Sequence, residues 1–420
     1  MKLLDILMEF NPWWETGRIQ DEFSKLKRRE IFFLLKETLE KRRIEVIVGL
    51  RRVGKTVLML HLIDFLLEKG VEPRKILYFS FDVEKKELDK ILREYEEKIL
   101  RKRIKQTKVY LFLDEIHKLE NWEEKIKVLY DFSPKAKIVL SGSASLNLMK
   151  KSRESLAGRA KFHHLTPLTF REFLRLRGEE IPKPEEYEIH KRKLDILLQE
   201  FIWKGFPETL EMNEKEAKEY AKELVVERII FRDIPENFRI EDVEIVRLLT
   251  EIIFRNPGII LNIDSLSRDF GRHKKTIRNA LSYIELSFLI KKVSNLRGSF
   301  LAISRKNRKG YPFHPSLCLT EEEDKIIESL VRSELGAKYY WRKGTNEVDF
   351  VLKNERILPI EVKNIEKVDK RDLKSLIKFL SLFNLKRGYL VNKEEEGIIR
   401  LDGKKIIIVP ITKFLLYEKY

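Results

Sequence analysis

Short apolar runs alternate with amphipathic segments between residues 43 and 165 of the chain. Four runs have the length and composition of strands that are buried on both faces of a parallel sheet: RIEVIVGL, KILYFSFD, KVYLFLDE and AKIVLSGS. The segments between them carry apolar residues at helical spacing: KTVLMLHLIDFLLEKG, EKKELDKILREYEEKIL and NWEEKIKVLYDF. Strands that alternate with helices in this way predict a doubly wound α/β domain.

The pattern changes after residue 165. Residues 166–240 have helical periodicity, interrupted at GEEIPKP and KGFPE, and residues 241–310 have the pattern of three helices and a short hairpin. Residues 311–420 return to mixed strands and helices. With an N-terminal linker and helix in residues 1–42 and the α/β core in residues 43–165, we expect five parts, which a chain of 420 residues can accommodate.

The segment GLRRVGKT lies between the first predicted strand and the first predicted helix. It fits the pattern G-x-x-x-x-G-K-[ST], in which backbone N–H groups, a helix N-terminus and a lysine surround a phosphate, and a hydroxyl binds Mg²⁺. The alternative is a loop that matches by coincidence. The pattern predicts ATP and Mg²⁺ as cofactors, with Thr56 on the metal. The predicted nucleotide-binding residues are Gly49, Arg52, Val53, Gly54, Lys55, Thr56 and Val57.

Polar residues follow two of the other predicted strands. Asp114 ends the apolar run VYLFL and can hold Mg²⁺, and the adjacent Glu115 can polarise the attacking water. The alternative is an ordinary strand end with two solvated acids. Ser141 ends the strand KIVL and could sense the γ-phosphate, although a plain turn rich in serine and glycine is also possible.

Arg159 lies in a predicted loop beyond the fourth strand, within SLAGRAKFHHL. In ring-forming ATPases an arginine at such a position reaches the γ-phosphate of the neighbouring subunit. A solvated loop arginine is the alternative. His163 and His164 are adjacent on a predicted strand and therefore face opposite ways, which is poor geometry for a shared metal, so we interpret them as structural.

The motifs GLRRVGKT, LFLDEIHKLENWE, LSGSAS, LAGR and LTPLTFREF resemble those of an archaeal and bacterial family of AAA+-like P-loop ATPases related to the STAND NTPases. The resemblance covers nearly the whole chain. It implies a helical lid containing GFP, a winged helix and, as in many members, a C-terminal domain similar to PD-(D/E)xK nucleases. It also implies an NPWW-like segment, in which Trp13 and Trp14 could stack on adenine or be buried aromatic residues.

Two apolar stripes separated by Gly271 have helix–turn–helix spacing, and LIKKV and SFLAIS, joined through SNLRG, predict a β-wing. The first stripe is Ile263, Leu266 and Phe270, and the second is Ile277, Leu281, Ile284 and Phe288. Between Arg268 and Lys309 the chain has twelve basic and two acidic residues. This concentration favours duplex DNA as a partner, although winged helices also bind proteins. The predicted DNA-binding residues are Arg272, Lys274, Lys275 and Arg278.

The segment NEVDFVLKNERILPIEVKN reads as a hairpin with chemistry on one face. Period-two geometry puts Val348, Phe350, Ile360 and Val362 on one side and Asp349, Glu361 and Lys363 on the other. Two carboxylates can hold Mg²⁺, and the ammonium can position water or stabilise a phosphorane. Glu328, on a predicted helix, matches the upstream acid of the PD-(D/E)xK pattern. A solvated hairpin face, or a domain that only binds, is the alternative.

Composition adds limits. The net charge is +17, from 85 basic and 68 acidic residues, which suggests a polyanionic partner. The single cysteine, Cys318, excludes a disulfide framework and a cysteine-ligated zinc site. A charged fraction of 36% is typical of hyperthermophile proteins. Acids interrupt the apolar start and no run of 18 apolar residues occurs, so we expect a soluble, cytoplasmic protein without a membrane partner.

Two functions agree with these observations. The first is a DNA-associated ATPase that assembles into homo-oligomers through contacts such as that of Arg159, docks through a winged helix and carries a nuclease-like domain. The second is a STAND-type signalling or scaffold switch that uses ATP to change its assembly, and whose C-terminal domain only binds.

Overall fold

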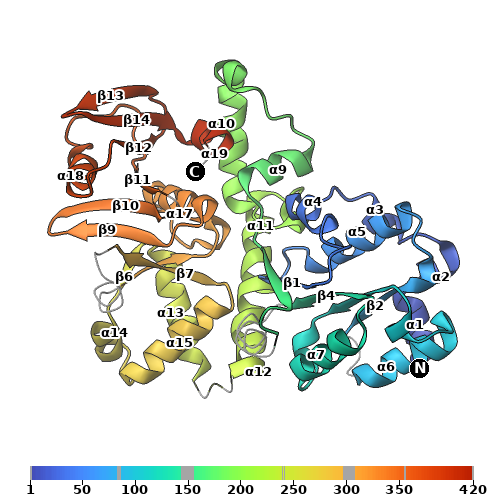
Figure 1. The fold of residues 1–420 in the computed structure, drawn as a ribbon. Coiled ribbons are helices and arrows are strands. Elements are labelled where there is room, and N and C mark those ends of the chain that lie inside the picture. The colour runs from blue at the N-terminus through green and yellow to red at the C-terminus, as the bar shows by residue number, and fades with distance from the viewer. Residues whose placement is uncertain are drawn as a thin grey trace. The chain divides into compact units, whose positions relative to one another are not determined.

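The computed structural model describes residues 2–82, 87–142, 156–238, 240, 242–296, 308–353 and 356–418. The chain forms two compact units, Met1–Thr166 and Pro167–Tyr420, and each has its own sheet (Figure 1).

The first unit is built on a five-stranded parallel sheet in the order β2-β3-β4-β1-β5. Every residue of β1 to β4 is buried, as the continuous apolar runs predicted. The prediction of a parallel α/β sheet is therefore confirmed. The strands are β1 (Ile44–Gly49), β2 (Ile76–Ser80), β3 (Val109–Asp114), β4 (Ala136–Gly142) and β5 (Ala160–Leu165).

Helices cover both faces of this sheet. From β1 the chain crosses to the far strand β2 and then returns through β3 to β4, so that α5 lies on one face and α6 and α7 lie on the other (Figure 1). The predicted helices are confirmed. They are α5 (Lys55–Glu68), α6 (Leu88–Glu94, extended by the π-helical η2, Tyr95–Leu100) and α7 (Trp122–Phe132), with short 3₁₀ turns η1 (Pro73–Lys75), η3 (Ile104–Gln106) and η4 (Ile116–Lys118).

The N-terminal segment, predicted as a linker, is part of the first unit. The Asn11 side chain donates to the Tyr78 carbonyl at 2.9 Å and accepts from the Tyr78 amide at 2.7 Å, which fixes the segment to β2. Trp13 and Trp14 are buried, and both indole N–H groups donate to the Ile76 carbonyl. They are therefore buried aromatic residues that pack on the sheet. The helices are α1 (Leu3–Phe10), α2 (Trp13–Thr16), α3 (Asp21–Ser24) and α4 (Glu30–Lys36).

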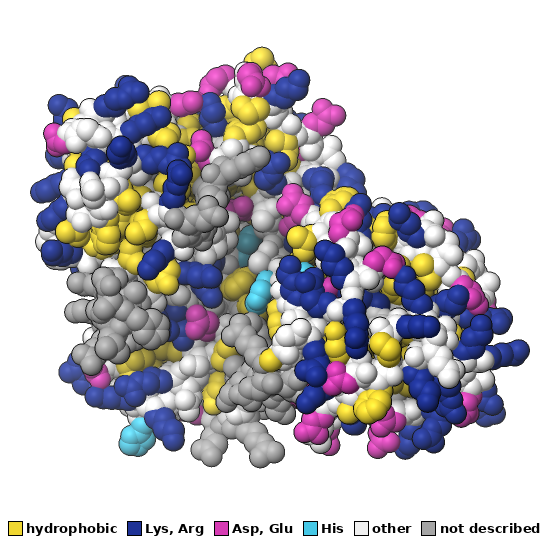
Figure 2. All heavy atoms as spheres, in the orientation of Figure 1, with side chains coloured by type: hydrophobic (Ala, Val, Ile, Leu, Met, Phe, Trp, Pro, Cys, Tyr) yellow, Lys and Arg dark blue, Asp and Glu magenta, His cyan; other side chains and the backbone are white. Residues whose placement is uncertain are grey.

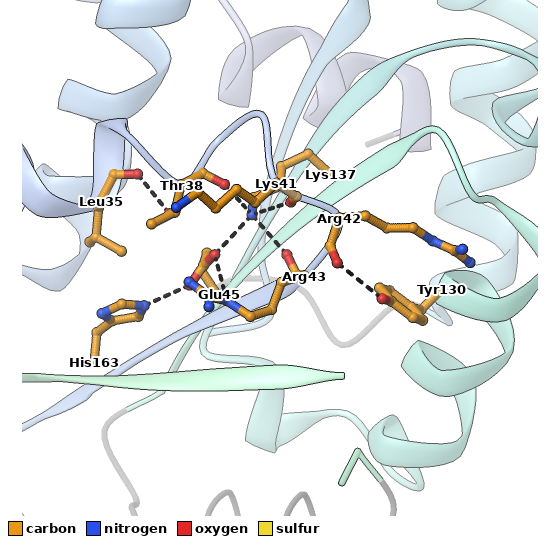
Figure 3. Close-up of polar contacts among 9 residues, drawn as sticks. All are labelled: Leu35, Thr38, Lys41, Arg42, Arg43, Glu45, Tyr130, Lys137 and His163. Carbon is orange, nitrogen blue, oxygen red and sulfur yellow. Dashed lines mark hydrogen bonds and ion pairs between the residues drawn. The ribbon is translucent and has the colours of Figure 1, made fainter. Parts of the chain in front are cut away.

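A buried ionic cluster joins the central strands of this sheet (Figure 3). The Glu45 carboxylate on β1 is fully buried and receives the Lys137 ammonium of β4 at 3.0 Å. The Nε2 atom of His163, on β5, lies 2.6 Å from the second Glu45 oxygen, whereas His164 is exposed. The prediction that the two histidines face opposite ways is confirmed. The cluster explains how charged residues are accommodated within buried strands, since each charge has a partner.

The second unit begins with helices that share a hydrophobic core with the C-terminal part of the chain. Phe170, Phe173 and Phe201 belong to the same buried cluster as Leu330, Phe350 and Phe414. The segment predicted as a helical lid is thus packed against residues more than 100 positions later. Its elements are α9 (Phe170–Arg177), η5 (Pro184–Glu186), α10 (Tyr187–Trp203), η6 (Pro207–Thr209), α11 (Glu214–Tyr220), the π-helical η7 (Ala221–Glu227) and η8 (Ile229–Asp233), and α12 (Ile234–Phe238).

The described parts of residues 243–312, which are 243–296 and 308–312, form three helices and three short strands. The strands form an antiparallel group in the order β6-β8-β7. The predicted wing segment SFLAIS lies outside the described residues. The predicted boundary between residues 310 and 311 falls inside β8. The elements are α13 (Val243–Arg255), β6 (Ile259–Leu261), α14 (Ile263–Asp269), α15 (Lys274–Leu286), β7 (Ile290–Asn295) and β8 (Arg308–Pro312).

The strands of residues 243–312 continue into the C-terminal sheet, so that a nine-stranded sheet runs in the order β13-β14-β12-β11-β10-β9-β7-β8-β6. The junction is a parallel pairing of β7 with β9, in which Ser294 opposes Tyr339. The remaining elements are η9 (Pro315–Leu317), α17 (Glu323–Leu335), β9 (Tyr339–Lys343), β10 (Asn346–Lys353), β11 (Ile357–Val362), α18 (Lys374–Leu382), β12 (Arg387–Asn392), β13 (Gly397–Leu401), β14 (Lys404–Pro410) and α19 (Ile411–Tyr417).

The hairpin of β10 and β11 is antiparallel, as predicted, but one part of the face prediction is wrong. The register of β10 against β9 shifts between Val348 and Val351. As a result Val348 packs in the cluster beneath α18, whereas Phe350, Ile360 and Val362 pack in the cluster that contains α17 residues. A bulge places an extra residue on one strand and breaks the period of two, which the sequence pattern could not show.

Candidate functional sites

The loop between β1 and α5 has the geometry of a phosphate cradle. Gly54 adopts a left-handed conformation (φ +89°) and Lys55 is the first residue of α5. A Cβ atom at Gly49 would lie 2.1 Å from the Leu165 carbonyl oxygen, so only glycine fits there. Lys55 is buried, and its ammonium donates to the Gly49 and Leu50 carbonyls at 3.3 and 3.0 Å. A helix N-terminus, a turned backbone and an ammonium therefore converge at one point, which suits an anion.

Three further P-loop residues have distinct environments. Arg52 is exposed and has a positive φ of 66°, Val53 is buried, and Val57 is partly buried on the first turn of α5. The Arg29 guanidinium, which the sequence pattern did not predict, donates to the Val53 carbonyl at 2.8 Å. Arg29 therefore holds the loop from the side of α4.

Asp114, at the end of β3, is the centre of a hydrogen-bond network. Its Oδ2 accepts from the Thr56 hydroxyl at 2.7 Å and from the Tyr78 hydroxyl at 2.9 Å, and its Oδ1 accepts from the Ser141 hydroxyl. Burial raises the pKa of Asp114, the charge of Glu115 raises it further, and these hydrogen bonds oppose both effects. Ser141 is fully buried, and its hydroxyl donates to Asp114. Tyr78 was not predicted, because a tyrosine within an apolar strand is typical of a core position.

Glu115 has a left-handed backbone (φ +50°), which turns the chain at the end of β3. Its amide donates to Asp114 Oδ1 at 3.0 Å and to Ser141 Oγ at 3.3 Å. Its Oε2 lies 3.3 Å from Nδ1 of the buried His117. The spacing Glu-x-His in DEIH was the only signal of this contact. The side chain of Glu115 is thereby oriented by a neighbour.

The donor set at Thr56 and Asp114 fits Mg²⁺. Both ligands are oxygen atoms and their 2.7 Å separation allows a single cation to touch both, while Mg²⁺ commonly takes its other ligands from water and phosphate. Among the described residues, no group of three or more His, Cys, Asp or Glu side chains forms a site for a metal held by protein alone. A nucleotide would therefore have to complete the coordination.

Arg159 lies at the end of the sheet where the parallel strands begin, whereas the P-loop lies at the end where they finish. Its carbonyl accepts from the amide of Ile44, the first residue of β1, whereas the P-loop follows the last residue of that strand. The Arg159 guanidinium forms a two-point contact with Asp131 of α7, at 2.9 and 3.2 Å. The structure thus does not bring Arg159 to the P-loop of its own chain.

A second group of ionisable residues gathers where β10 and β11 face α17. Asp349 Oδ2 accepts from the Val362 amide at 2.9 Å, and the buried Glu361 carboxylate accepts from the Lys363 ammonium at 3.1 Å. Burial raises the pKa of Asp349 to about 7, and the charge of Glu328 adds to this effect. Burial and the charge of Asp349 raise the pKa of Glu361 well above its usual range. The four predicted residues are therefore close enough to interact electrostatically.

Lys309 of β8 joins this group, although the sequence pattern assigned it to the basic wing. Its buried ammonium lies 2.5 Å from a Glu347 oxygen and 3.3 Å from a Glu328 oxygen. The Tyr311 hydroxyl donates to the same Glu328 oxygen at 2.5 Å. Although burial lowers the pKa of Lys309, the carboxylates of Glu328 and its neighbours outweigh this effect and raise it. We call Glu328, Glu347, Asp349, Glu361, Lys309 and Lys363 the carboxylate cluster.

One atom of the carboxylate cluster fits a bound cation. Glu361 Oε2 is buried and has no hydrogen-bond partner among the described residues, and the neighbouring Asp349 contributes a second carboxylate. A buried unpaired carboxylate oxygen is costly unless a cation or water satisfies it. Asp349 and Glu361 are therefore the residues of this cluster that could hold Mg²⁺.

The α15 surface carries the predicted basic residues. Lys274, Lys275 and Arg278, which we call the α15 basic trio, are all exposed at the start of the helix. Arg272 precedes the helix and pairs with Asp242, and Lys274 pairs with Asp264 at 2.6 Å. Lys and Arg side chains gather over α14 and α15 in the surface view (Figure 2). The positive surface is thus present, with part of its charge balanced by local acids.

Comparison with known families agrees with the first site. Residues 41–174 match the family described as an AAA domain, so this part of the chain is an AAA-type P-loop ATPase domain. Residues 195–321 and 323–414 match two families described as domains of unknown function, DUF8612 and DUF4143. Among the described residues, no helix has the length and apolarity needed to cross a bilayer.

Relatives extend over most of the chain. The uncharacterized protein MJ1544 of Methanocaldococcus jannaschii is 29% identical over 405 residues, which cover 89% of this chain and 88% of the relative. The uncharacterized protein MJ1637 of the same organism is 26% identical over 452 residues. The match covers 96% of this chain and 92% of the relative. An uncharacterized Haemophilus influenzae protein is 27% identical over 264 residues. The match covers 61% of this chain and 64% of the relative.

Solved structures give weaker similarities. AMPPCP-bound DnaA from Aquifex aeolicus is 16% identical with a TM-score of 0.27, and covers 66% of this chain and 92% of its own. The S. cerevisiae Hsp104–ADP complex is 14% identical with a TM-score of 0.34, and the match covers 68% of this chain and 41% of the Hsp104 chain. A DNA replication initiation factor is 18% identical with a TM-score of 0.25, and covers 61% and 86%.

Proposed function

We propose that this chain is a magnesium-dependent ATPase that binds DNA and carries a nuclease-like site. The observation that carries the ATPase part is the 2.7 Å contact of Thr56 with Asp114 beside Lys55 at the helix N-terminus. In P-loop NTPases such an arrangement holds the metal and the phosphates. Bound Mg²⁺–ATP would supply the phosphoryl group, whose charge the metal neutralises.

The roles of the chain's own residues follow from their contacts. Lys55 neutralises phosphate oxygens, and Asp114 holds the Thr56 hydroxyl in place. Glu115 orients and polarises water, and the nearby His117 orients Glu115. Ser141 ties the end of β4 to Asp114, so that a change in the carboxylate is transmitted to that strand end. Arg159 acts on the site of a neighbouring copy, because its position at the opposite end of the sheet keeps it from its own.

We assign DNA binding to residues 243–312, interpreted as a winged helix. The order α13-β6-α14-α15-β7-β8 with the sheet β6-β8-β7 supports this interpretation, since it is the order of helices and strands in that fold. The α15 basic trio is exposed at the start of the second helix of the pair, where it could contact phosphates. The carboxylate cluster, interpreted as a PD-(D/E)xK site, would bind a metal through Asp349 and Glu361.

The direct test is ATP hydrolysis measured with and without duplex, forked and single-stranded DNA. We expect DNA to accelerate hydrolysis, Lys55→Ala to abolish it, and Glu115→Gln to retain nucleotide binding while turnover stops. Lys309→Met is a matched control, because it removes a buried ammonium of the second unit. Equal hydrolysis in the wild type and in both P-loop variants would refute the ATPase.

A second function, an ATP-dependent switch whose C-terminal domain only binds, is favoured by one observation. Lys309 pairs with Glu328, which matches the upstream acid of the PD-(D/E)xK pattern, and with Glu347, and an acid held in an ion pair is less free to take part in cleavage. A switch would hydrolyse ATP slowly, without acceleration by DNA. It would also cut no duplex, flap or branched substrate in Mg²⁺ or Mn²⁺, so the two functions give opposite results in the same assays.

A further inference from the structure

The Tyr78 hydroxyl reaches the candidate magnesium site from β2. The side chain is buried, and its hydroxyl donates to Asp114 Oδ2 at 2.9 Å. A phenylalanine would fill the same space, and a buried hydroxyl costs free energy unless it has a hydrogen-bond partner. Packing of the core therefore does not require this hydroxyl, and its partner is the carboxylate that we assign to the metal.

The two hydroxyls on Asp114 Oδ2 come from different directions. Thr56, at 2.7 Å, belongs to the P-loop helix and is itself a proposed metal ligand, so its oxygen has to face the cation. Tyr78 belongs to β2, which β3 and β4 separate from β1 and its P-loop. The Tyr78 hydroxyl is thus the donor that can stay on Asp114 when Thr56 turns to a metal.

Strand register brings Tyr78 to Asp114. On the paired strands Tyr78 opposes Phe112, and Ser80 opposes Asp114. Residues two apart on a strand point to the same face, and an aromatic side chain can reach a diagonal neighbour on the next strand. A slip of β2 by one residue would turn Tyr78 to the other face of the sheet. Whatever fixes β2 therefore also fixes the hydroxyl at Asp114.

The N-terminal segment fixes β2 at this point. β2 lies at the edge of its sheet, where backbone groups need partners from outside the sheet. The Asn11 side-chain amide supplies them, as donor to the Tyr78 carbonyl at 2.9 Å and as acceptor from the Tyr78 amide at 2.7 Å. The Phe10 ring packs edge-on against the Tyr78 ring, with centroids 6.1 Å apart. Two adjacent residues thus hold both the backbone and the ring of Tyr78.

We propose that Tyr78 is a positioning residue for the metal site and that Asn11 sets Tyr78 in place. The contacts run from Asn11 through Tyr78 to Asp114, and they hold the carboxylate in the orientation that Mg²⁺ needs. This role for Tyr78 rests on the proposed ATPase. It gives the N-terminal segment a task at the metal rather than at the adenine base.

The test is the effect of Mg²⁺ on nucleotide binding, measured with fluorescent mant-AMPPNP in Mg²⁺ and in EDTA. The ratio of the Kd in EDTA to the Kd in Mg²⁺ reports how strongly the metal is held, and it needs no hydrolysis. In Tyr78→Phe we expect this ratio to fall about tenfold, because loss of a group that orients a metal ligand commonly costs about 10- to 100-fold in metal affinity. We expect the Kd in EDTA to be unchanged, because the carboxylate then has no cation to hold. The variant keeps the ring that packs against Phe10, so it tests the hydroxyl alone.

The matched control is Tyr110→Phe. Tyr110 is also buried, on the neighbouring strand β3, and its hydroxyl also donates to a carboxylate, that of Glu40, at 2.8 Å. It precedes Asp114 by four positions, which is about 13 Å along the strand. We therefore expect the wild-type ratio in this variant. A ratio in Tyr78→Phe that equals or exceeds the ratio in Tyr110→Phe would overturn the proposal.

Asn11→Ala tests the other half of the chain of contacts. In the wild-type background we expect the ratio to fall in the same direction as in Tyr78→Phe. In the Tyr78→Phe background we expect no further fall, because Asn11 acts through the tyrosine. Independent losses that add in the double variant would overturn the link from Asn11 through Tyr78.

The wild type in the same assay separates this role from the proposed function. If the wild type binds no mant-AMPPNP, or binds it equally in Mg²⁺ and in EDTA, the proposed ATPase is wrong and Tyr78 has no such role. If the wild type shows the magnesium effect and Tyr78→Phe retains it in full, the ATPase stands and the role of Tyr78 alone is refuted.

Discussion

Replacement of Lys137 by methionine tests how the central strands of the first unit are held together. The Lys137 ammonium is buried and donates to Glu45 and to the carbonyls of Thr38, Lys41 and Arg43, at 2.8 to 3.0 Å. Methionine has a similar volume but no charge and no donor. The substitution therefore leaves the buried Glu45 carboxylate with His163 and Arg43 as its remaining partners.

The expected loss is large because one partner of a buried pair is removed while the other stays. Such deletions cost about 3–5 kcal/mol, against a total stability of about 5–15 kcal/mol for a typical domain. The pKa values also indicate that deletion of one partner costs more than the intact pair contributes. Burial would raise the pKa of Glu45, but His163 and Lys137 outweigh it and lower the pKa to about 2. Burial lowers the pKa of Lys137, so the ammonium itself opposes folding and the intact pair stabilises less than its deletion costs.

The sign of the pH dependence follows from Glu45. A carboxyl whose folded pKa is depressed contributes stability that is present above its unfolded pKa and lost as the pH falls through the folded pKa. A shift from 4.5 to about 2 corresponds to about 3 kcal/mol, lost between these two values. Without Lys137 the folded pKa of Glu45 is less depressed, so the loss should still begin near 4.5 but should be smaller and be complete at a higher pH.

Hydrogen exchange of peptides from β1 and β4 can be followed across a series of guanidinium concentrations. It measures the free energy of opening of the first unit separately from that of the second. We expect Lys137→Met to lower the free energy of opening at pH 7 by about 3 kcal/mol or more. Adding Glu45→Gln should recover part of the loss, because the unpaired charge is then gone. If the double variant loses the sum of the single losses to within about 0.5 kcal/mol, the two groups are not coupled and the reasoning is wrong.

Three further outcomes are expected. Asp349→Asn should remove metal-dependent DNA cleavage while ATP hydrolysis persists; loss of both activities together would point to misfolding. Alanine substitution of the α15 basic trio should lower the slope of log affinity against log salt by roughly 0.9 per lost phosphate contact, and an unchanged slope would favour a protein partner. Mixing Arg159→Ala with Lys55→Ala protein should restore part of the ATPase activity, since one composite site is then intact; no rescue in a demonstrated mixed assembly would contradict action between copies.

Periodicity located the elements of the first unit well. The strands β1 to β4 are continuous apolar runs that end in Gly49, Ser80, Asp114 and Gly142, and such runs predict buried parallel strands with polar ends at one edge of the sheet. The P-loop was recognisable because its glycines and lysine are adjacent in sequence. Local spacing is sufficient for such a site.

Contacts made across the fold were not recognisable. Tyr78 meets Asp114 from a different strand, and Lys309 meets Glu347 across a distance of 38 positions in a segment that looked like a solvated basic wing. The bulge near Val348 reversed the face of one residue without any glycine or proline to signal it. These features depend on which strands become neighbours, and periodicity carries no information on strand order.

The pairing of β7 with β9 fixes a distance. Backbone hydrogen bonds join Ser294 to Lys338 at 2.9 Å and Leu296 to Tyr340 at 2.7 Å, so neither strand can slide past the other without breaking them. The helix α15 packs against β7 of this seam, whereas Glu347, Asp349 and Glu361 of the carboxylate cluster lie on β10 and β11, beyond β9. A duplex resting on α15 would present the same phosphate to the cluster in every complex. In the proposed function, the sheet would fix the distance between the DNA-docking surface and the cleavage site. The products of cleavage would then all end at the same distance from the docking position.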